Sequence, residues 1–224
     1  MVAGKFRGFG EHAVDFYDGL NADNSKAYWT DNREIYESDV RAPMQALLDD
    51  LTAEFGDFGT SKIFRPYRDV RFGKDKTPYK THCGAVVEPG RGAGAFYVQL
   101  SSDGLLVAGG SFHTTPEQLR RMRESVADDR RGGELEKILA KLGKQGWSTY
   151  GEKLKSTPRG YEKDHPRIDL LRHKSLYAST TYEPDDALHE PETAQRVRTR
   201  WRQVRVLNEW AADHVGMPDP LVDR

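Results

Sequence analysis

The sequence predicts an α+β fold, in which helices from the N-terminal, central and C-terminal parts of the chain pack on an antiparallel sheet of about four to six strands. Apolar residues recur at helical spacing before residue 56 and again after residue 115, whereas the segment between them alternates with a period of two. Turns rich in Gly and Pro separate the alternating segments. Because 224 residues suffice for one sizeable core, we expect a single domain over 1–224.

Two helical segments are expected before the sheet. The first runs from Phe9 to Leu20 and is followed by a polar break, with Asp23 and Asn24 as N-cap candidates. The second runs from about Lys26 to Phe55. Pro43 should kink this second helix or split it in two, because proline removes a helical hydrogen bond.

The central segment is expected to form an antiparallel meander. Pro66 makes its first strand an edge strand or the site of a bulge, because proline cannot donate to a ladder. The turn at Ser102-Asp103-Gly104 is a hairpin signal. The four expected strands are Lys62–Phe72, His82–Glu88, Ala95–Ser101 and Leu105–Phe112.

Helices and one more strand are expected after the meander. Pro116 favours the first turn of a helix, with Thr114 or Thr115 as its cap. The segment Trp147–Leu154 fits neither period clearly. The expected elements are helices over Glu117–Ala127 and Gly133–Leu142, a short helix from about Leu170, a strand over Leu176–Tyr182 and a final helix over Glu190–Val215.

Charge is unevenly distributed along the chain, although the formal net charge is −1. Residues 11–57 carry twelve Asp or Glu against three Lys or Arg, whereas residues 62–82 carry seven Lys or Arg against two Asp. The near-zero total argues against a wholly basic nucleic-acid-binding protein. The local cationic excess, followed by a loop with Gly and Pro, predicts a site for a phosphate or carboxylate.

Cysteine usage and hydropathy favour a cytoplasmic protein. Cys83 is the only cysteine, so no disulfide can form within the chain. The N-terminus has no apolar run of signal-peptide length, and no segment approaches a membrane span. We therefore expect neither membrane association nor a cysteine-based zinc site.

The cationic segment supplies most of the predicted binding residues. Positions 65, 67, 69 and 71 read Arg, Tyr, Asp, Arg and are expected on one strand face. The Arg and Asp side chains of such a row can pair with one another in an ion-pair network. Alternatively, the Asp can orient the guanidinium groups, whose remaining donors bind an anion. We predict anion binding by Arg65, Arg68, Arg71, Lys74, Lys76, Lys80, Arg159 and Lys174, with Tyr67, Asp69 and Tyr79 in support.

Candidates for proton transfer are few. Asp75 in the cationic loop and His165 in an Asp-His-Pro turn are the acid or base candidates. The loop lacks the spacing of a phosphate-binding P-loop. The seven histidines show no metal-ligand spacing, so we expect no metal and no cofactor.

Three functions fit these residues. The leading hypothesis is a cationic pocket for a phosphate-bearing small molecule or nucleotide, in which electrostatic stabilisation would carry any catalysis. A nucleic-acid-binding module is the second, because aromatic residues alternate with the cations and the final helix has an arginine-rich face. A structural or protein-interaction domain with an internal Arg/Asp ion-pair network is the third. The sequence does not decide whether the ligand is a substrate.

Three segments together carry a family resemblance. They are F-R-P-Y-R-D-V-R-F-G-K-D-K-T-P-Y-K-T-H, P-R-G-Y-E-K-D-H-P-R-I-D-L-L-R-H-K and the opening N-A-D-N-S-K-A-Y-W. Together with the later aromatic strand and the Gly109-Gly110 stretch, they resemble a bacterial and fungal family of conserved hypothetical proteins, catalogued as domain of unknown function 2461. Asn21 and Asn24 are separated here, a small departure from the usual pattern.

The resemblance spans about residues 6–215 and implies a single intact domain of that family. It implies no activity and no catalytic residues. It places the centre of the family's motif at Arg65, Arg68, Asp69, Arg71, Lys74, Asp75, Lys76, Tyr79 and Lys80.

Overall fold

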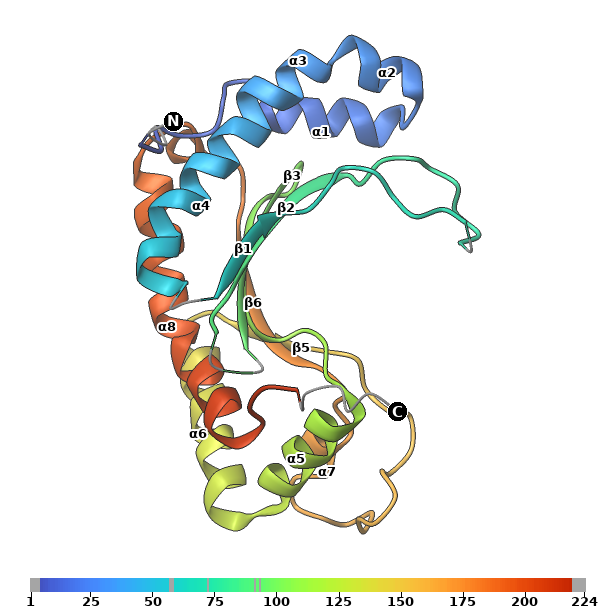
Figure 1. Ribbon diagram of the computed structural model, residues 1–224, viewed down its shortest axis with the longest axis vertical. Coiled ribbons are helices and arrows are strands. Elements are labelled where there is room, and N and C mark those ends of the chain that lie inside the picture. The colour runs from blue at the N-terminus through green and yellow to red at the C-terminus, as the bar shows by residue number, and fades with distance from the viewer. Residues whose placement is uncertain (1–4, 57–58, 72, 91, 93, 219–224) are drawn as a thin grey trace. The chain divides into compact units, whose positions relative to one another are not determined.

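The protein has the predicted α+β fold, with one antiparallel sheet of six strands (Figure 1). A computed structural model describes residues 5–56, 59–71, 73–90, 92 and 94–218. The strand order across the sheet is β1-β2-β3-β4-β6-β5, so the predicted four-strand meander is confirmed. The strands are β1 (Thr60–Ile63), β2 (His82–Glu88), β3 (Ala95–Ser101), β4 (Gly104–Ser111), β5 (Ser148–Tyr150) and β6 (Leu176–Tyr182).

The chain forms two compact units, each assembled from separate stretches of sequence. Unit 1 comprises residues 1–87, 97–107 and 181–199, and unit 2 comprises residues 88–96, 108–180 and 200–224. Strands β2, β3, β4 and β6 contribute residues to both units.

Unit 1 begins with a series of helices over an aromatic core. Phe16 and Trp29 pack edge to face with ring centroids 5.8 Å apart, and Trp29 lies 4.8 Å from Tyr36. All three rings are buried. The helices are α1 (Ala13–Ala22), α2 (Lys26–Asp31), α3 (Arg33–Ile35), the π-helix η1 (Tyr36–Arg41) and α4 (Ala42–Phe55), and a 3₁₀ turn, η2 (Asp186–His189), lies later in the chain.

The helix boundaries differ from the predicted ones for local reasons. α1 starts at Ala13 because the Phe9 amide donates outside any helix, to the Leu188 carbonyl oxygen at 3.0 Å. Pro43, which was predicted to kink the second helix or split it in two, lies in the first turn of α4 directly after the π-helix η1. The backbone stays helical through Arg41 and Ala42, so the hydrogen-bond pattern changes before Pro43 but the helix is not split there. A break lies at Asn32.

The cap of α2 is Ser25, and the prediction of Asp23 or Asn24 was wrong. The Ser25 hydroxyl accepts a hydrogen bond from the Tyr28 amide at 3.1 Å, as a helix cap does. Asn24 has a different role, which involves a residue 55 positions away in the sequence.

β1 is shorter than predicted. The expected strand ran to Phe72, which lies outside the described residues, but β1 ends at Ile63. Pro66 has no amide hydrogen to donate to a ladder. Residues 65–71 therefore do not form the regular strand face that the alternation predicted.

Unit 2 packs helices around buried tryptophans. Trp201 lies 5.3 Å from Phe96, and the Trp147 indole donates to Gln203 at 3.1 Å. The helices are α5 (Pro116–Ala127), α6 (Asp129–Lys144), α7 (Ile168–Leu171) and α8 (Glu192–His214), which begins in unit 1. Thr115 caps α5 in a capping box with Gln118, as the Thr-Pro signal predicted.

Arg167 joins the end of α5 to the start of α6. Only 8% of this residue is exposed. Its Nε donates to the Val126 carbonyl oxygen at 2.7 Å, and its Nη2 donates to Ala127 at 3.1 Å and to the Asp129 carboxylate at 2.7 Å. These bonds satisfy carbonyl groups that α5 leaves without helical partners.

α6 starts four residues before the predicted Gly133, because Asp128 caps it through the Arg131 amide. A glycine lies in the first turn because a Cβ at Gly132 would come within 2.6 Å of the Arg167 side chain. The ambiguous segment from Trp147 contains β5, which pairs antiparallel with β6 through Tyr150 and Tyr177.

Among the residues that the structure describes, no helix is long and apolar enough to cross a membrane.

Candidate anion-binding site

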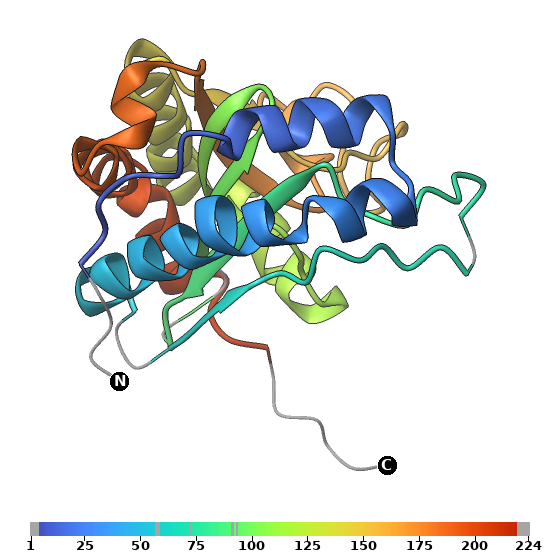
Figure 2. The ribbon, with the colours of Figure 1, turned by 90° about the horizontal axis from the view of Figure 1, so that it is seen from above.

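The chain between β1 and β2 leaves the sheet as a two-stranded excursion, residues 64–81, which we call the arm (Figures 1 and 2). Tyr67 and Tyr79 form an isolated antiparallel bridge near its base. The flanking amides of Arg68 and Lys80 donate to proline carbonyl oxygens across the arm at 2.8 and 2.7 Å. This is a non-hydrogen-bonded pair, the arrangement that brings facing side chains closest together.

Helix α2 anchors the arm. The carboxamide of Asn24 donates to the Tyr79 carbonyl oxygen and accepts from the Tyr79 amide, each at 3.1 Å. The Trp29 indole stacks on the Tyr79 ring with centroids 4.4 Å apart and an interplanar angle of 8°. Tyr79, at the base of the arm, is therefore held through both its backbone and its side chain.

The tip of the arm, residues 68–77, pairs its own charges. Arg68 donates to Asp75 and to the Thr77 hydroxyl. Arg71 donates to both oxygens of Asp69, at 2.9 and 2.7 Å. The ammonium group of Lys76 donates to the Val70 carbonyl oxygen at 2.8 Å. Three of the predicted anion-binding cations therefore have partners within the tip.

Both carboxylates of the tip are held in the ionised form. Hydrogen bonds from Thr77 and then from Arg68 lower the pKa of Asp75 to about 2. Hydrogen bonds from Arg71 lower the pKa of Asp69. At neutral pH Asp75 is therefore a charged, hydrogen-bonded acceptor, which suits an ion-pair role better than proton donation.

The base of the arm differs from the tip, because in the described part of the chain its cations form no ion pair with a carboxylate, although the charge of Arg65 adds to the lowering of the Asp69 pKa by Arg71. The ammonium groups of Lys62 and Lys80 each lie 5.3 Å from the centroid of the Phe64 ring. Within the described residues, the side chains of Lys62, Arg65 and Lys80 make no hydrogen bond or ion pair with an acidic group. We call Lys62, Phe64, Arg65 and Lys80 the basal cluster.

The groups of the basal cluster repel one another. Burial, and then the neighbouring Arg65 charge, lowers the pKa of the half-buried Lys80 ammonium. Burial, and then the charge of Lys80, lowers the pKa of His82. Each cation disfavours the protonated form of its neighbours. An anion that binds beside them therefore stabilises the charged cluster.

Strand β3 lies beside the basal cluster. The Tyr97 ring is 6.3 Å from Phe64, and its hydroxyl donates to Gln99 at 2.8 Å. Tyr97 crosses β2 at Gly84, where a Cβ would lie 2.3 Å from the phenolic oxygen. Glycine at this position leaves room for the ring.

The remaining predicted site residues belong to unit 2. Arg159 is exposed in the loop Thr157–Asp164, which lines an open hollow of about 560 Å³. The Lys174 ammonium pairs with Glu152. His165 Nδ1 accepts from the Arg167 amide at 3.0 Å, which ties this imidazole into a turn.

Sequence reasoning missed four residues of this region: Asn24, Trp29, Phe64 and Tyr97. Asn24 was assigned to a cap, and no local signal pairs it with Tyr79 across the sequence. Lys62 was counted among the cations of the segment but was not assigned to the site. In the part of the chain that the structure describes, no group of three His, Cys, Asp or Glu side chains is arranged to hold a metal ion.

The comparisons with known proteins identify a family. The model of the conserved hypothetical protein family DUF2461 matches residues 12–210, which include most of each unit and the whole arm. No protein among the curated sequences matches the chain.

Proposed function

The chain belongs to the DUF2461 family of conserved hypothetical proteins, and we propose that it binds a phosphate-bearing small molecule or nucleotide at the basal cluster of the arm. Lys62, Arg65 and Lys80 would neutralise the phosphate, and the Phe64 ring lies beside both ammonium groups. Tyr97 would border the site from β3.

The observation that carries this proposal is the contrast between the two ends of the arm. At the tip, Arg68 and Arg71 each have a carboxylate partner. At the base, Lys80 is half-buried beside Arg65 and has no acidic partner among the described residues. Positive side chains held close together repel one another, which costs free energy unless a negative charge binds beside them. We therefore expect the ligand of this cluster to be an anion.

The number of positive groups favours a ligand with more than one negative charge. Three cationic side chains share the basal cluster, whereas a carboxylate would neutralise only one of them. A phosphate monoester or a diphosphate carries about two charges or more at neutral pH. The proposal therefore names phosphate-bearing ligands in preference to simple carboxylates.

The predicted ion-pair network is supported for the tip. We propose that Asp69 and Asp75 order the arm, and that Arg68, Arg71 and Lys76 act through its shape. Their contribution to ligand affinity would come mainly from holding the base in place.

Isothermal titration calorimetry with pyrophosphate and with nucleoside mono- and diphosphates tests this proposal. Lys80→Gln should weaken binding about tenfold, because a charged hydrogen bond is lost. Lys74→Gln is the matched control, since it removes the same charge from an exposed position at the tip. We expect that control to change affinity less than about twofold at physiological salt.

Two results would reject the proposal. One is the absence of binding heat and of any thermal shift with every phosphate compound. The other is an equal loss in Lys80→Gln and Lys74→Gln, which would mean that the ligand responds only to overall charge.

A further inference from the structure

Tyr67 presents an aromatic ring to solvent at the base of the arm. It is one of the few large apolar side chains that are strongly exposed in the described chain, with 50% of its surface accessible. Its ring lies 5.5 Å from Tyr79 and 6.0 Å from Trp29. The Tyr67 ring is tilted by 45° to Tyr79 and by 51° to Trp29. Tyr67 is therefore the exposed member of a cluster of three rings, in which the other two are stacked and buried.

We propose that the arm binds single-stranded nucleic acid, with an unpaired base stacked on the exposed ring of Tyr67 and the flanking phosphates near Arg65 and Lys74. Aromatic rings interleaved with cations are the recurring surface for single strands, because every base has a stacking face and every nucleotide a phosphate. This binding goes beyond the proposed small-ligand function and depends on a different residue, Tyr67.

Contacts within the protein hold the Tyr67 ring in place. Tyr67 is held opposite Tyr79 by the two backbone hydrogen bonds of the arm. Tyr79 is held in turn by the Asn24 carboxamide and by stacking on Trp29. A pre-ordered aromatic ring loses little conformational entropy when a base stacks on it.

The charge of the arm suits a polyanion. Residues 64–81 carry six Lys or Arg against two Asp, a net of +4. Arg65 and Lys74 make no hydrogen bond or ion pair within the portion of the chain that is described. These two cations lie on either side of Tyr67 in sequence, and both are exposed.

A single strand fits this surface better than a duplex. The bases of a duplex are stacked on one another and offer no face to Tyr67. The ligand that matches both the ring and the cations is therefore a flexible strand with exposed bases.

Fluorescence anisotropy of labelled oligothymidylate and oligouridylate of roughly 15 nucleotides tests the proposal on the full chain. The wild-type protein and Tyr67→Phe should bind alike. Tyr67→Ala should bind about tenfold more weakly or worse, because one base loses its stacking partner. Tyr150→Ala is the matched control, since Tyr150 is 49% exposed but lies in unit 2.

Affinity should also fall when salt is raised from about 50 mM to about 200 mM, because phosphate contacts release counterions. A duplex of the same length should bind more weakly than the single strand. The proposal is overturned if no oligonucleotide binds at the lower salt, if Tyr67→Ala binds like wild type, or if the duplex binds equally well. Salt-sensitive self-association in place of oligonucleotide binding would overturn it too, and would assign the arm to an acidic surface of a second copy.

The two proposals can fail separately. Pyrophosphate has no base, so Tyr67→Ala should leave its affinity unchanged, whereas Lys80→Gln should reduce it. Tyr67-dependent oligonucleotide binding without any pyrophosphate binding would reject the proposed small-ligand site alone. Pyrophosphate binding without Tyr67-dependent oligonucleotide binding would reject the inference drawn from Tyr67 alone.

Discussion

The carboxamide of Asn24 hydrogen-bonds to both polar backbone groups of Tyr79, donating to the carbonyl oxygen and accepting from the amide at 3.1 Å in each case. A side chain here takes the place of a neighbouring β-strand. It fixes the arm at the one point where Tyr79 is also stacked on Trp29. The position of the basal cluster therefore depends on a residue that would not contact the ligand.

Replacing Asn24 with Ala should lower the stability of the protein by about 1–2 kcal/mol, because a partly buried donor and acceptor on the Tyr79 backbone lose their partners. Denaturant unfolding measures this change. Amide hydrogen exchange at Arg68 and Lys80 should also become faster. Asn21→Ala is the control, since the Asn21 side chain is exposed and donates to the Ser102 hydroxyl. Equal effects of the two substitutions would show that Asn24 does not anchor the arm.

The affinity of the basal cluster for pyrophosphate should fall as pH rises. Burial and Arg65 lower the pKa of Lys80, so its ammonium loses its proton at a lower pH than an exposed lysine does. An anion binds the protonated form, so affinity should be highest below this pKa and decline through it. Calorimetry from about pH 7 to about pH 10 measures the decline. Lys80→Arg should flatten it, because a guanidinium stays charged, and an unchanged profile in that variant would exclude Lys80 as its source.

The free energy of unfolding should decrease in mild acid because of His173. This buried imidazole has its Nδ1 2.8 Å from the Ser175 carbonyl oxygen, and burial lowers its pKa. The unfolded chain then binds a proton more readily than the folded chain, with a histidine pKa of about 6.5. The stability that neutral His173 contributes is fully present above the unfolded-state pKa. It is lost as the pH falls from that pKa toward the lower pKa of the folded state.

Chemical denaturation across this range measures the His173 effect. His173→Asn places an amide nitrogen near the position of Nδ1 and should reduce the acid slope. His82, whose pKa is lowered by burial and Lys80, contributes a slope of the same sign. His82→Asn is therefore the comparison, and an undiminished slope in both variants would assign the acid sensitivity to other groups.

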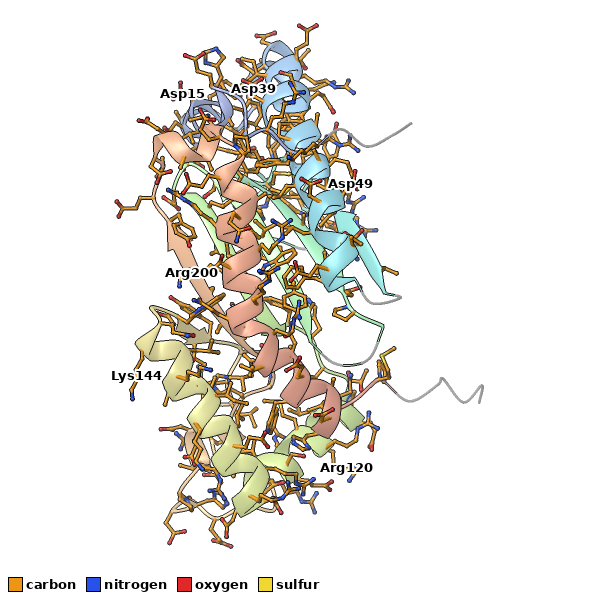
Figure 3. The ribbon with its side chains drawn as sticks, turned by 90° about the vertical axis from the view of Figure 1, so that its left-hand side faces the viewer. Asp15, Asp39, Asp49, Arg120, Lys144 and Arg200 are labelled. Carbon is orange, nitrogen blue, oxygen red and sulfur yellow. The ribbon has the colours of Figure 1, made fainter. Side chains whose placement is uncertain are left out.

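Arg167→Met should destabilise unit 2 by about 2–3 kcal/mol, because it leaves the carbonyl oxygens of Val126 and Ala127 without donors. Thermal unfolding followed by circular dichroism measures the loss. Arg120→Met is the control, because Arg120 forms its ion pairs with Glu117 and Glu124 on the exposed surface (Figure 3). Exposed pairs contribute about 0–1 kcal/mol. A comparable loss in both variants would contradict the capping role of Arg167.

The elements with local signals could be predicted from the amino-acid sequence alone. The period of two gave the bounds of β2, β3 and β6 as the structure has them. The Thr-Pro start and helical spacing likewise gave α5. In each case, neighbouring residues set both the backbone conformation and the buried face, so no distant contact was needed.

The candidate site, in contrast, depends on contacts that form only in the folded chain. The alternation of residues 62–72 predicted one strand, but β1 ends at Ile63 and the chain continues as the arm. The sequence placed seven cations together without showing which of them have acidic partners. The fold pairs Arg68 and Arg71 at the tip and leaves Arg65 and Lys80 beside Phe64. That division depends on the turn of the arm and on contacts across more than 50 residues, such as Asn24 with Tyr79, which local periodicity does not encode.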